Sequence, residues 1–436
     1  MTGLFEGLLA EIAGAAPVRR VGRVVETRRG LAEVAGLDAA TIGDRVLIHS
    51  RDGTAGGEVL RLRPGRCSVL PDASGDGMAI NDRVELLGRA EIAPDNSWVG
   101  RVISAAGQPL DGRSLLRGAR PRALRAAAPA AATRRRLGAR LGTGLAVFDT
   151  LLPLVRGQRT GLFAGSGVGK SSLLARFAQG VEADVVIIAL VGERGRELRE
   201  FTERVLGPAG MARSIVVTAT SDQSPLMRRT CALTAMAVAE HFRDQGLHVL
   251  LLVDSVTRFA EAHREVALAG GEEASLRGYP PSLTQAITGL AERAGPGPEG
   301  AGDITAVFSV LVAGSDMDEP VADILRGVLD GHVVLDRRIA ERGRFPAIDL
   351  LRSVSRSLPE AASDDENALI SAARRLLGAY DRVELMIQAG LYAGGSDPEI
   401  DRAIRHWPAL DAFLAEDAPL TGVEGSFQNL RACLDD

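Results

Sequence analysis

Short β-rich runs of apolar residues, broken by polar turn pairs, fill the chain from Val18 to about Ile92. Closely spaced runs with Gly/Asp punctuation are typical of small antiparallel barrels. We therefore expect a β-barrel over residues 17–92. The expected strands are residues 21–25, 31–34, 45–48, 58–62 and 83–87, with turns at Gly43-Asp44, Asp52-Gly53 and Asn81-Asp82.

Continuous apolar runs replace this pattern from about Arg159 to Asp336. Such runs are typical of strands buried on both faces, and helical stretches such as residues 225–244 separate several of them. The alternation predicts an α/β core with a mostly parallel sheet, which binds ligands at the carboxyl ends of its strands. The runs are residues 160–164, 185–191, 215–218, 249–253, 306–312 and 333–335.

Helical periodicity marks both ends of the chain. After Pro359 we expect a small C-terminal helical domain, over residues 357–436, with helices at 366–379, 382–388, 398–404 and 408–414. Apolar residues at positions 4, 5, 8, 9 and 12 predict a short amphipathic helix within residues 1–16. The pattern leaves open whether this helix packs on its own domain or docks a partner.

The composition is that of a globular protein with several domains. The 436 residues are 46% apolar and 25% charged, with a formal net charge of −5, which excludes disordered, collagen-like and coiled-coil chains. Three cysteines without CxxC spacing argue against a disulfide scaffold or zinc site and indicate a reducing, cytoplasmic location. We expect neither a membrane span nor a secretory signal, because the apolar runs are short and residues 1–16 are acidic.

The basic residues are distributed unusually. Of the 51 basic residues, Lys170 is the only lysine, which suggests that a compact ammonium is needed there and a guanidinium does not fit. Residues 113–148 hold arginines but no acidic residue. This segment predicts an exposed basic connection. Contact with nucleic acid or an anionic membrane is the less favoured alternative.

Lys170 belongs to a P-loop, the strongest motif in the chain. The sequence AGSGVGKS, residues 164–171, follows an apolar strand and precedes a helix, which is the context that this motif requires. Ala164 replaces the first glycine of the consensus, at a position that begins the turn. The expected nucleotide-binding residues are Gly165, Ser166, Gly167, Val168, Gly169, Lys170, Ser171 and Ser172. The backbone would surround the phosphates, Lys170 would reach the β- and γ-phosphates, and Ser171 would ligate Mg²⁺.

A Walker-B strand is the second signal. Residues 250–253 are apolar and deliver one carboxylate, Asp254, at the strand end. Buried strands that end in aspartate are common, so this motif is weak evidence alone. It becomes strong evidence for a nucleotide site because the same chain has a P-loop. Asp254 is expected to hold Mg²⁺ through the water ligands of the metal.

Hydrolysis also needs a group that activates water. Glu193 follows another apolar strand, which places it at the same edge of the sheet as Lys170. We expect Glu193 to polarise the attacking water, Arg194 to contact the γ-phosphate, and Glu197 to join the water shell of Mg²⁺. The alternative is that residues 193–200 form a solvated, charged helix start.

Taken in order, nine segments resemble the catalytic subunits of the rotary ATP synthase superfamily. Within it, they are most similar to the ATPases of flagellar type III export, also called flagellum-specific ATP synthases. The resemblance covers nearly the whole chain. The segments are FAGSGVGKS (163–171), LVGERGRE (190–197), ATSDQ (219–223), DSVTRF (254–259), GYPPS (278–282), LDGH (329–332), FPAID (345–349), SVSR (353–356) and GSDPEID (395–401).

The resemblance implies a RecA-like domain over residues 93–356 and roles that spacing does not show. Family members form homohexameric rings with nucleotide between subunits, so Arg356 resembles the arginine finger supplied by a neighbour. Such a finger is worth about 10³–10⁵ in rate. Phe345 stands where the family places an aromatic ring against adenine, and Arg258 stands where coupling between sites is expected. The activity implied is Mg²⁺-dependent ATP hydrolysis.

The resemblance also implies partners and a location. The N-terminal helix and barrel would contact a stator-like regulatory protein. The C-terminal helices would face export substrates, chaperones and a coiled-coil stalk protein. The ring would act in the cytoplasm, associated with the inner membrane at the flagellar base and its export gate.

Four other functions are weighed against flagellar export. The virulence injectisome ATPase has nearly the same chemistry. The amino-acid sequences of residues 164–166 and 192–197 look more like those of the flagellar system. A synthase subunit fits less well, because one chain here supplies both base and finger. A non-catalytic nucleotide-binding subunit should lack Glu193. An RNA translocase should carry aromatic residues on its barrel, whereas residues 18–92 contain none, so we expect no nucleic-acid partner.

Overall fold

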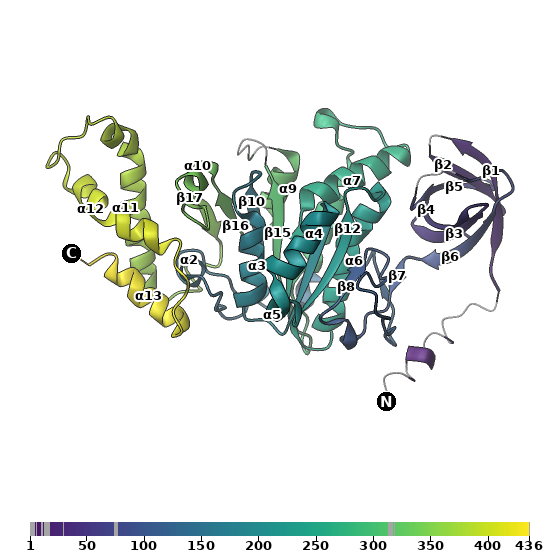
Figure 1. The fold of residues 1–436 in the computed structure, drawn as a ribbon, viewed down its shortest axis with the longest axis horizontal. Coiled ribbons are helices and arrows are strands. Elements are labelled where there is room, and N and C mark those ends of the chain that lie inside the picture. Colours follow the sequence, from purple (N-terminus) through teal and green to yellow (C-terminus); the bar gives the residue numbers. More distant parts are fainter. Residues whose placement is uncertain are drawn as a thin grey trace.

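The computed structural model describes residues 5, 7–9, 12, 18–28, 30–73, 77–312, 317 and 319–435. Three parts follow one another along the longest axis of the molecule (Figure 1). A closed barrel lies at one end, a sheet covered by helices in the middle, and the last helices of the chain at the other end. This arrangement confirms the predicted fold class, an α/β core between a small barrel and a helical domain.

The barrel strands close in the order β1-β2-β5-β4-β3-β6, with antiparallel neighbours. The bounds are β1 Val21–Arg28, β2 Leu31–Ala35, β3 Asp44–Ser50, β4 Gly53–Arg63, β5 Arg66–Pro71 and β6 Arg83–Arg89. Val24, Val46 and Val69 are fully buried, because alternate side chains of each strand point into the barrel. The sequence pattern does not predict β5, whose polar residues Arg66 and Ser68 interrupt the apolar run.

The central sheet has the order β17-β16-β10-β15-β13-β11-β12-β8. Neighbours from β16 to β8 run parallel, whereas β17 and the short β14 pair antiparallel with β16 and β15. The prediction of a mostly parallel sheet is therefore confirmed. The bounds are β8 Val102–Ser104, β10 Arg159–Ala164, β11 Val185–Glu193, β12 Ser214–Thr220, β13 His248–Asp254, β14 Gly295–Pro296, β15 Asp303–Leu311, β16 Gly331–Leu335 and β17 Ile348–Ser355. A separate pair, β7 Glu91–Ile92 and β9 Arg122–Ala123, lies beside the core.

Two apolar clusters cover the two faces of this sheet. Helices α6 to α9 pack on one face, and α2 and α3 pack on the other, where the C-terminal helices join the cluster through α2 and the last strand, β17. Strands buried on both faces must be apolar at consecutive positions, which explains the continuous runs in the sequence. The helices are α2 Ala146–Asp149, α3 Lys170–Gly180, α4 Gly195–Glu200, α5 Gly207–Met211, α6 Pro225–Arg243, α7 Val256–Ala269, α8 Ser282–Arg293, α9 Pro320–Val328 and α10 Arg337–Glu341, with a π-helical turn at Phe201–Val205.

The C-terminal helices are longer than the sequence predicts. Helix α11 runs without a break over Asp364–Gln388, and α12 spans Pro398–Phe413 with Pro408 inside it. A proline in a helix removes only its own hydrogen bond and clashes locally. Here the buried face formed by Ala403, Leu410 and Phe413 keeps the helix continuous. A further helix, α13 Gly422–Ala432, is not predicted by the pattern.

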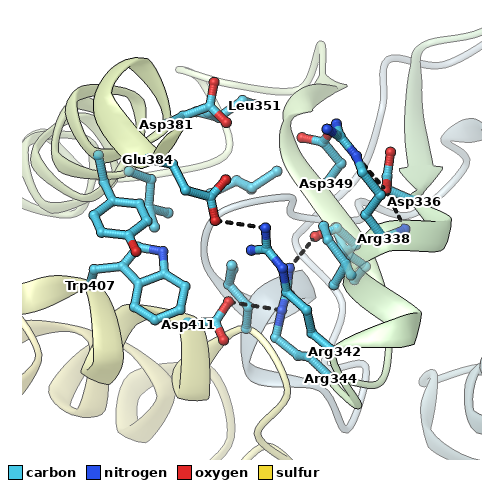
Figure 2. Close-up of a pocket in the computed structure, with 16 residues that line it drawn as sticks. Asp336, Arg338, Arg342, Arg344, Asp349, Leu351, Asp381, Glu384, Trp407 and Asp411 are labelled. Carbon is cyan, nitrogen blue, oxygen red and sulfur yellow. Dashed lines mark hydrogen bonds and ion pairs between the residues drawn. The ribbon is translucent and has the colours of Figure 1, made fainter. Parts of the chain in front are cut away.

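The segment between α10 and β17 is tied to these helices at a cavity of about 110 Å³ (Figure 2). Arg342 forms an ion pair of 2.6 Å with Glu384 of α11. Arg344 lies 3.0 Å from the carboxylate of Asp411 on α12. Both arginines lie within three residues before Phe345, so the segment that bears this aromatic ring is joined to the C-terminal part of the chain.

The arginine-rich segment 113–148 is exposed at most positions from 113 to 140, as its charge predicts, but several of its arginines are held in ion pairs. Its arginines reach acidic residues of the barrel, the core and the C-terminal helices, some of them more than 150 positions away. All charges of this segment are positive, and the acidic residues that hold its side chains in place lie elsewhere in the sequence. The pairs are Arg122 with Asp244, Arg125 with Glu58, Arg134 with Glu292, Arg135 with Asp303, and Arg140 with Glu366.

The predicted N-terminal helix, residues 1–16, lies largely outside the described residues. Those that are described, 5, 7–9 and 12, are helical, and Phe5, Leu9 and Ile12 are exposed. Within the described parts of the chain, no helix combines the length and apolar character that a membrane span requires.

Candidate functional site

The predicted phosphate loop joins β10 to the N-terminus of α3. Strand β10 lies between β15 and β16, so the loop leaves the sheet at an interior strand. Gly167 and Gly169 have φ angles of 78° and 88°, in the left-handed region that residues with a Cβ rarely adopt. A loop of this form, followed directly by a helix N-terminus, offers backbone N–H groups and a partial positive charge to an anion.

Lys170 and Asp254 meet at this loop. Lys170 is the first residue of α3, and its ammonium forms an ion pair with Asp254, the last residue of β13. Both side chains are buried, with exposed fractions of 11% and 4%. The strand order β10-β15-β13 therefore brings the two predicted residues into contact across β15.

Glu193 ends β11 and lines the same cavity as Lys170. Burial is the main cause that raises the pKa of Glu193 to about 7. The negative charge of Asp254 and a hydrogen bond with Glu197 raise it further, whereas the charge of Lys170 lowers it. A carboxyl group with a pKa near 7 is suited to accept a proton from water at neutral pH.

Two of the predicted residues lie at the start of α4, beside Glu193. The Arg194 guanidinium is largely exposed and lies 3.6 Å from the carboxylate of Glu197. The side chain of Arg258 on α7 packs against Gly192. Together with the phosphate loop they enclose a cavity of about 440 Å³. Its lining is Gly165, Ser166, Gly167, Gly169, Lys170, Ser171, Ser172, Gly192, Glu193, Arg194, Glu197, Ser221, Arg258 and Leu311.

Phe345 lies against the phosphate loop of its own chain. A Cβ added to Gly169 would come within 3.1 Å of the Phe345 ring, so the ring and the loop are in close approach. Half of Phe345 is exposed. An exposed aromatic face beside a phosphate loop is suited to stack against a planar base.

The residues predicted to hold Mg²⁺ surround a second cavity of about 270 Å³, which shares residues with the first. Ser171, Asp254 and Glu197 line it together with Glu193. Among the described residues, no group of three or more His, Cys, Asp or Glu side chains is arranged to hold a metal ion. A hydroxyl and carboxylates provide oxygen atoms of the kind that Mg²⁺ prefers when it also keeps waters and binds substrate phosphates. The donor set therefore fits Mg²⁺ bound together with a nucleotide.

Sequence comparison gives the family of this chain. Residues 144–355 match the nucleotide-binding domain of the ATP synthase alpha/beta family, and residues 362–431 match the C-terminal domain of the type III secretion ATPase EscN. The flagellum-specific ATP synthase of Caulobacter vibrioides is 43% identical over 431 residues, which cover 96% of this chain and 97% of the relative. The chain belongs to the flagellar and type III secretion ATPases of the ATP synthase alpha/beta family.

A secretion relative and a solved structure agree with this assignment. The type 3 secretion system ATPase of Xanthomonas euvesicatoria is 40% identical over 430 residues, covering 98% of this chain and 97% of the relative. Assembled EscN of enteropathogenic Escherichia coli, solved with its central stalk EscO, has a TM-score of 0.87 and 34% identity, covering 95% of this chain and 100% of that chain. This chain is therefore an ATPase of the same family.

Arg356 is the one predicted residue of this ATPase that the fold keeps apart from the rest. It follows β17, whose Ser355 pairs with Gly331 at the beginning of β16. Because β16 runs parallel to β10, Arg356 lies at the amino-terminal ends of these strands, whereas the phosphate loop lies at their carboxyl ends. The Arg356 side chain is exposed and donates a hydrogen bond of 3.2 Å to the carbonyl of Arg326. Within one chain of the ATPase, Arg356 and Lys170 are not brought together.

Two serines of the ATPase site are not indicated by the sequence motifs. Ser309 on β15 donates a hydrogen bond of 2.8 Å to Asp254. The backbone N–H of Ser221 donates to the carbonyl of Glu193 at 3.0 Å, and Ser221 lines the cavity. Ser309 carries one available signal, because it is the single polar residue in the apolar run 306–312.

Proposed function

We propose that this ATPase hydrolyses MgATP to drive flagellar type III protein export. One observation carries the catalytic part: Glu193, whose pKa is raised to about 7, lines the same cavity as Lys170, whose ammonium is paired with Asp254. A phosphate loop alone would bind nucleotide, whereas a base beside it also activates water. The close relationship to flagellum-specific ATP synthases supports the biological role.

The residues take the following roles in this proposal. The backbone from Gly165 to Ser172 and the ammonium of Lys170 bind the phosphates, and the Phe345 ring stacks on adenine. In this proposal the Lys170 ammonium turns from Asp254 to the phosphates. Glu193 accepts the proton of the attacking water, and Arg194 contacts the γ-phosphate.

Ser171, Asp254 and Glu197 hold Mg²⁺ directly or through its waters. When bound, Mg²⁺ would neutralise charge on the phosphates. The cavity shared by these side chains supports the assignment.

The active form is proposed to be a homohexameric ring in which each subunit completes the site of its neighbour. The position of Arg356 at the far edge of the sheet supports a finger that acts on another subunit. Residues 1–16 and the barrel (17–92) would contact a stator-like regulatory protein. The domain 357–436, which follows the nucleotide domain (93–356) along the chain, would face the stalk protein, export substrates and chaperones. The solved EscN–EscO complex supports a stalk partner. The ring would work in the cytoplasm at the inner membrane and export gate of the flagellar base.

A role in a virulence injectisome is the second candidate function. The 40% identity to the Xanthomonas secretion ATPase favours it almost as much as the flagellar relatives favour export. The chemistry would be unchanged, and only the exported proteins and the partner gate would differ.

One variant tests catalysis and biological role together. Glu193→Gln should bind a fluorescent ATP analogue as the natural chain does but should lose turnover, because the amide cannot accept the proton. In the native host, this variant should fail to assemble flagellar filaments. Near-normal hydrolysis would remove Glu193 from its role. Intact filaments together with lost secretion of effector proteins would favour the injectisome.

A further inference from the structure

Ser309 is a buried hydroxyl at the centre of the sheet. It lies on β15 with an exposed fraction of zero, between the strand that leads to the phosphate loop and the strand that ends at Asp254. Its register partner on β10 is Leu162, and the next residue before it, Phe308, pairs with Val253. A buried hydroxyl costs free energy unless it finds a hydrogen-bond partner, and here the partner is the Asp254 carboxylate at 2.8 Å.

Ser309 and Lys170 share one acceptor atom. The Lys170 ammonium and the Ser309 hydroxyl both donate to Oδ1 of Asp254, so neither of them occupies Oδ2. In the proposed function, Lys170 turns to the phosphates when nucleotide binds. Ser309 then keeps its hydrogen bond to Oδ1, because it is fixed in the interior of the sheet. The lysine ammonium, in contrast, sits on a flexible four-carbon side chain.

We propose that Ser309 is a positioning residue for magnesium binding: its hydroxyl holds Oδ1 of Asp254 and thereby directs Oδ2 to the metal's water shell. This inference rests on the proposed nucleotide site. The carboxylate would otherwise rotate about its last bond once Lys170 has left. Hydrogen bonds that orient a metal-binding carboxylate are commonly worth about 10- to 100-fold in metal affinity or activity.

The test separates magnesium binding from nucleotide binding. A fluorescent ATP analogue is titrated into the full-length protein in EDTA, and then magnesium is titrated into the complex and into an ATPase assay. Ser309→Ala should raise the magnesium concentration for half-saturation by about tenfold in both titrations. Its affinity for the analogue in EDTA should stay unchanged. Ser309→Thr keeps the hydroxyl and should restore the magnesium response, whereas Ser309→Cys, a weak donor, should resemble the alanine variant.

Thr305 provides the matched control. It lies on the same strand with a fully buried hydroxyl, which bonds to Gly157 and His248 far from the phosphate loop. Thr305→Val removes this hydroxyl with little change of shape and should leave the magnesium response unchanged.

Three outcomes would overturn the inference. They are an unchanged magnesium response in Ser309→Ala, an equal loss of affinity in EDTA, and an equal shift in Thr305→Val. If the natural chain binds no analogue with or without magnesium, the proposed function fails and this inference fails with it.

Discussion

The Lys170 ammonium is ion-paired with the Asp254 carboxylate at the phosphate loop, and both side chains are buried. In the proposed function, the nucleotide phosphates would compete with Asp254 for the Lys170 ammonium, and the released carboxylate would be available to Mg²⁺. The exchange would link phosphate binding and metal binding through a single side chain.

The first prediction concerns the shape of this cation. Lys170→Arg should reduce ATP turnover by about 100-fold or more, because a planar guanidinium cannot replace a compact ammonium between Asp254 and the phosphates. Steady-state kinetics would measure the loss. Arg176→Lys, on the same helix but outside the cavity lining, is the control and should keep its activity. Full turnover in Lys170→Arg would contradict the importance of the ammonium.

The second prediction concerns pH. The pKa of Glu193 is raised to about 7, so the carboxyl is protonated and inactive as a base at lower pH. The pH profile of kcat/KM reports the free enzyme. It should fall about tenfold per pH unit on the acidic side of about 7 and level off above it. A flat profile from pH 5.5 to about 8 would be inconsistent with Glu193 as the base.

The third prediction concerns Arg356, which lies at the sheet edge away from its own Lys170. Arg356→Ala alone should lose about 10³-fold or more in turnover. Mixing it with Lys170→Ala chains, which retain Arg356 but cannot bind phosphate, should restore part of the activity, because mixed rings contain complete sites. No rescue in mixtures that are shown to assemble would argue against a finger acting between subunits.

The fourth prediction concerns Phe345, which lies against Gly169 and is half exposed. Phe345→Ala should raise KM for ATP by about tenfold, since base stacking on an aromatic ring is worth about 1–3 kcal/mol. Phe345→Tyr should stay close to the natural chain. Inhibition by inorganic triphosphate, which has no base, should be unaffected. An equal loss of triphosphate affinity would show that the ring supports only the loop.

The fifth prediction concerns stability at the junction with the C-terminal helices (Figure 2). Burial lowers the pKa of Arg344, and the charge of Asp411 opposes this effect. Asp411→Asn should lower the free energy of unfolding by about 1–2 kcal/mol, because it leaves a buried guanidinium without its countercharge. Glu341→Gln breaks the exposed pair with Arg337 and should cost below about 0.5 kcal/mol. Denaturant titration would compare them, and equal costs would contradict the burial argument.

Local rules explain why much of the chain could be predicted. The phosphate loop follows from glycines between a strand and a helix, and the strands of the core follow from uninterrupted apolar runs. Local rules fail where distant residues decide. Helix α12 continues through Pro408 because one of its faces is buried, and strand β5 forms because β2 and β4 pair with both its edges.

The sequence by itself determined the nature of the chemistry: a single lysine in a phosphate loop, a carboxylate at the end of an apolar strand, and an acidic residue after another. These signals are contiguous, so short-range geometry is sufficient to read them. Only the tertiary structure decided the strand order that brings Ser309 against Asp254 and moves Arg356 to the opposite edge of the sheet. Strand order depends on which distant segments pair to bury their surfaces, and no local pattern encodes that choice.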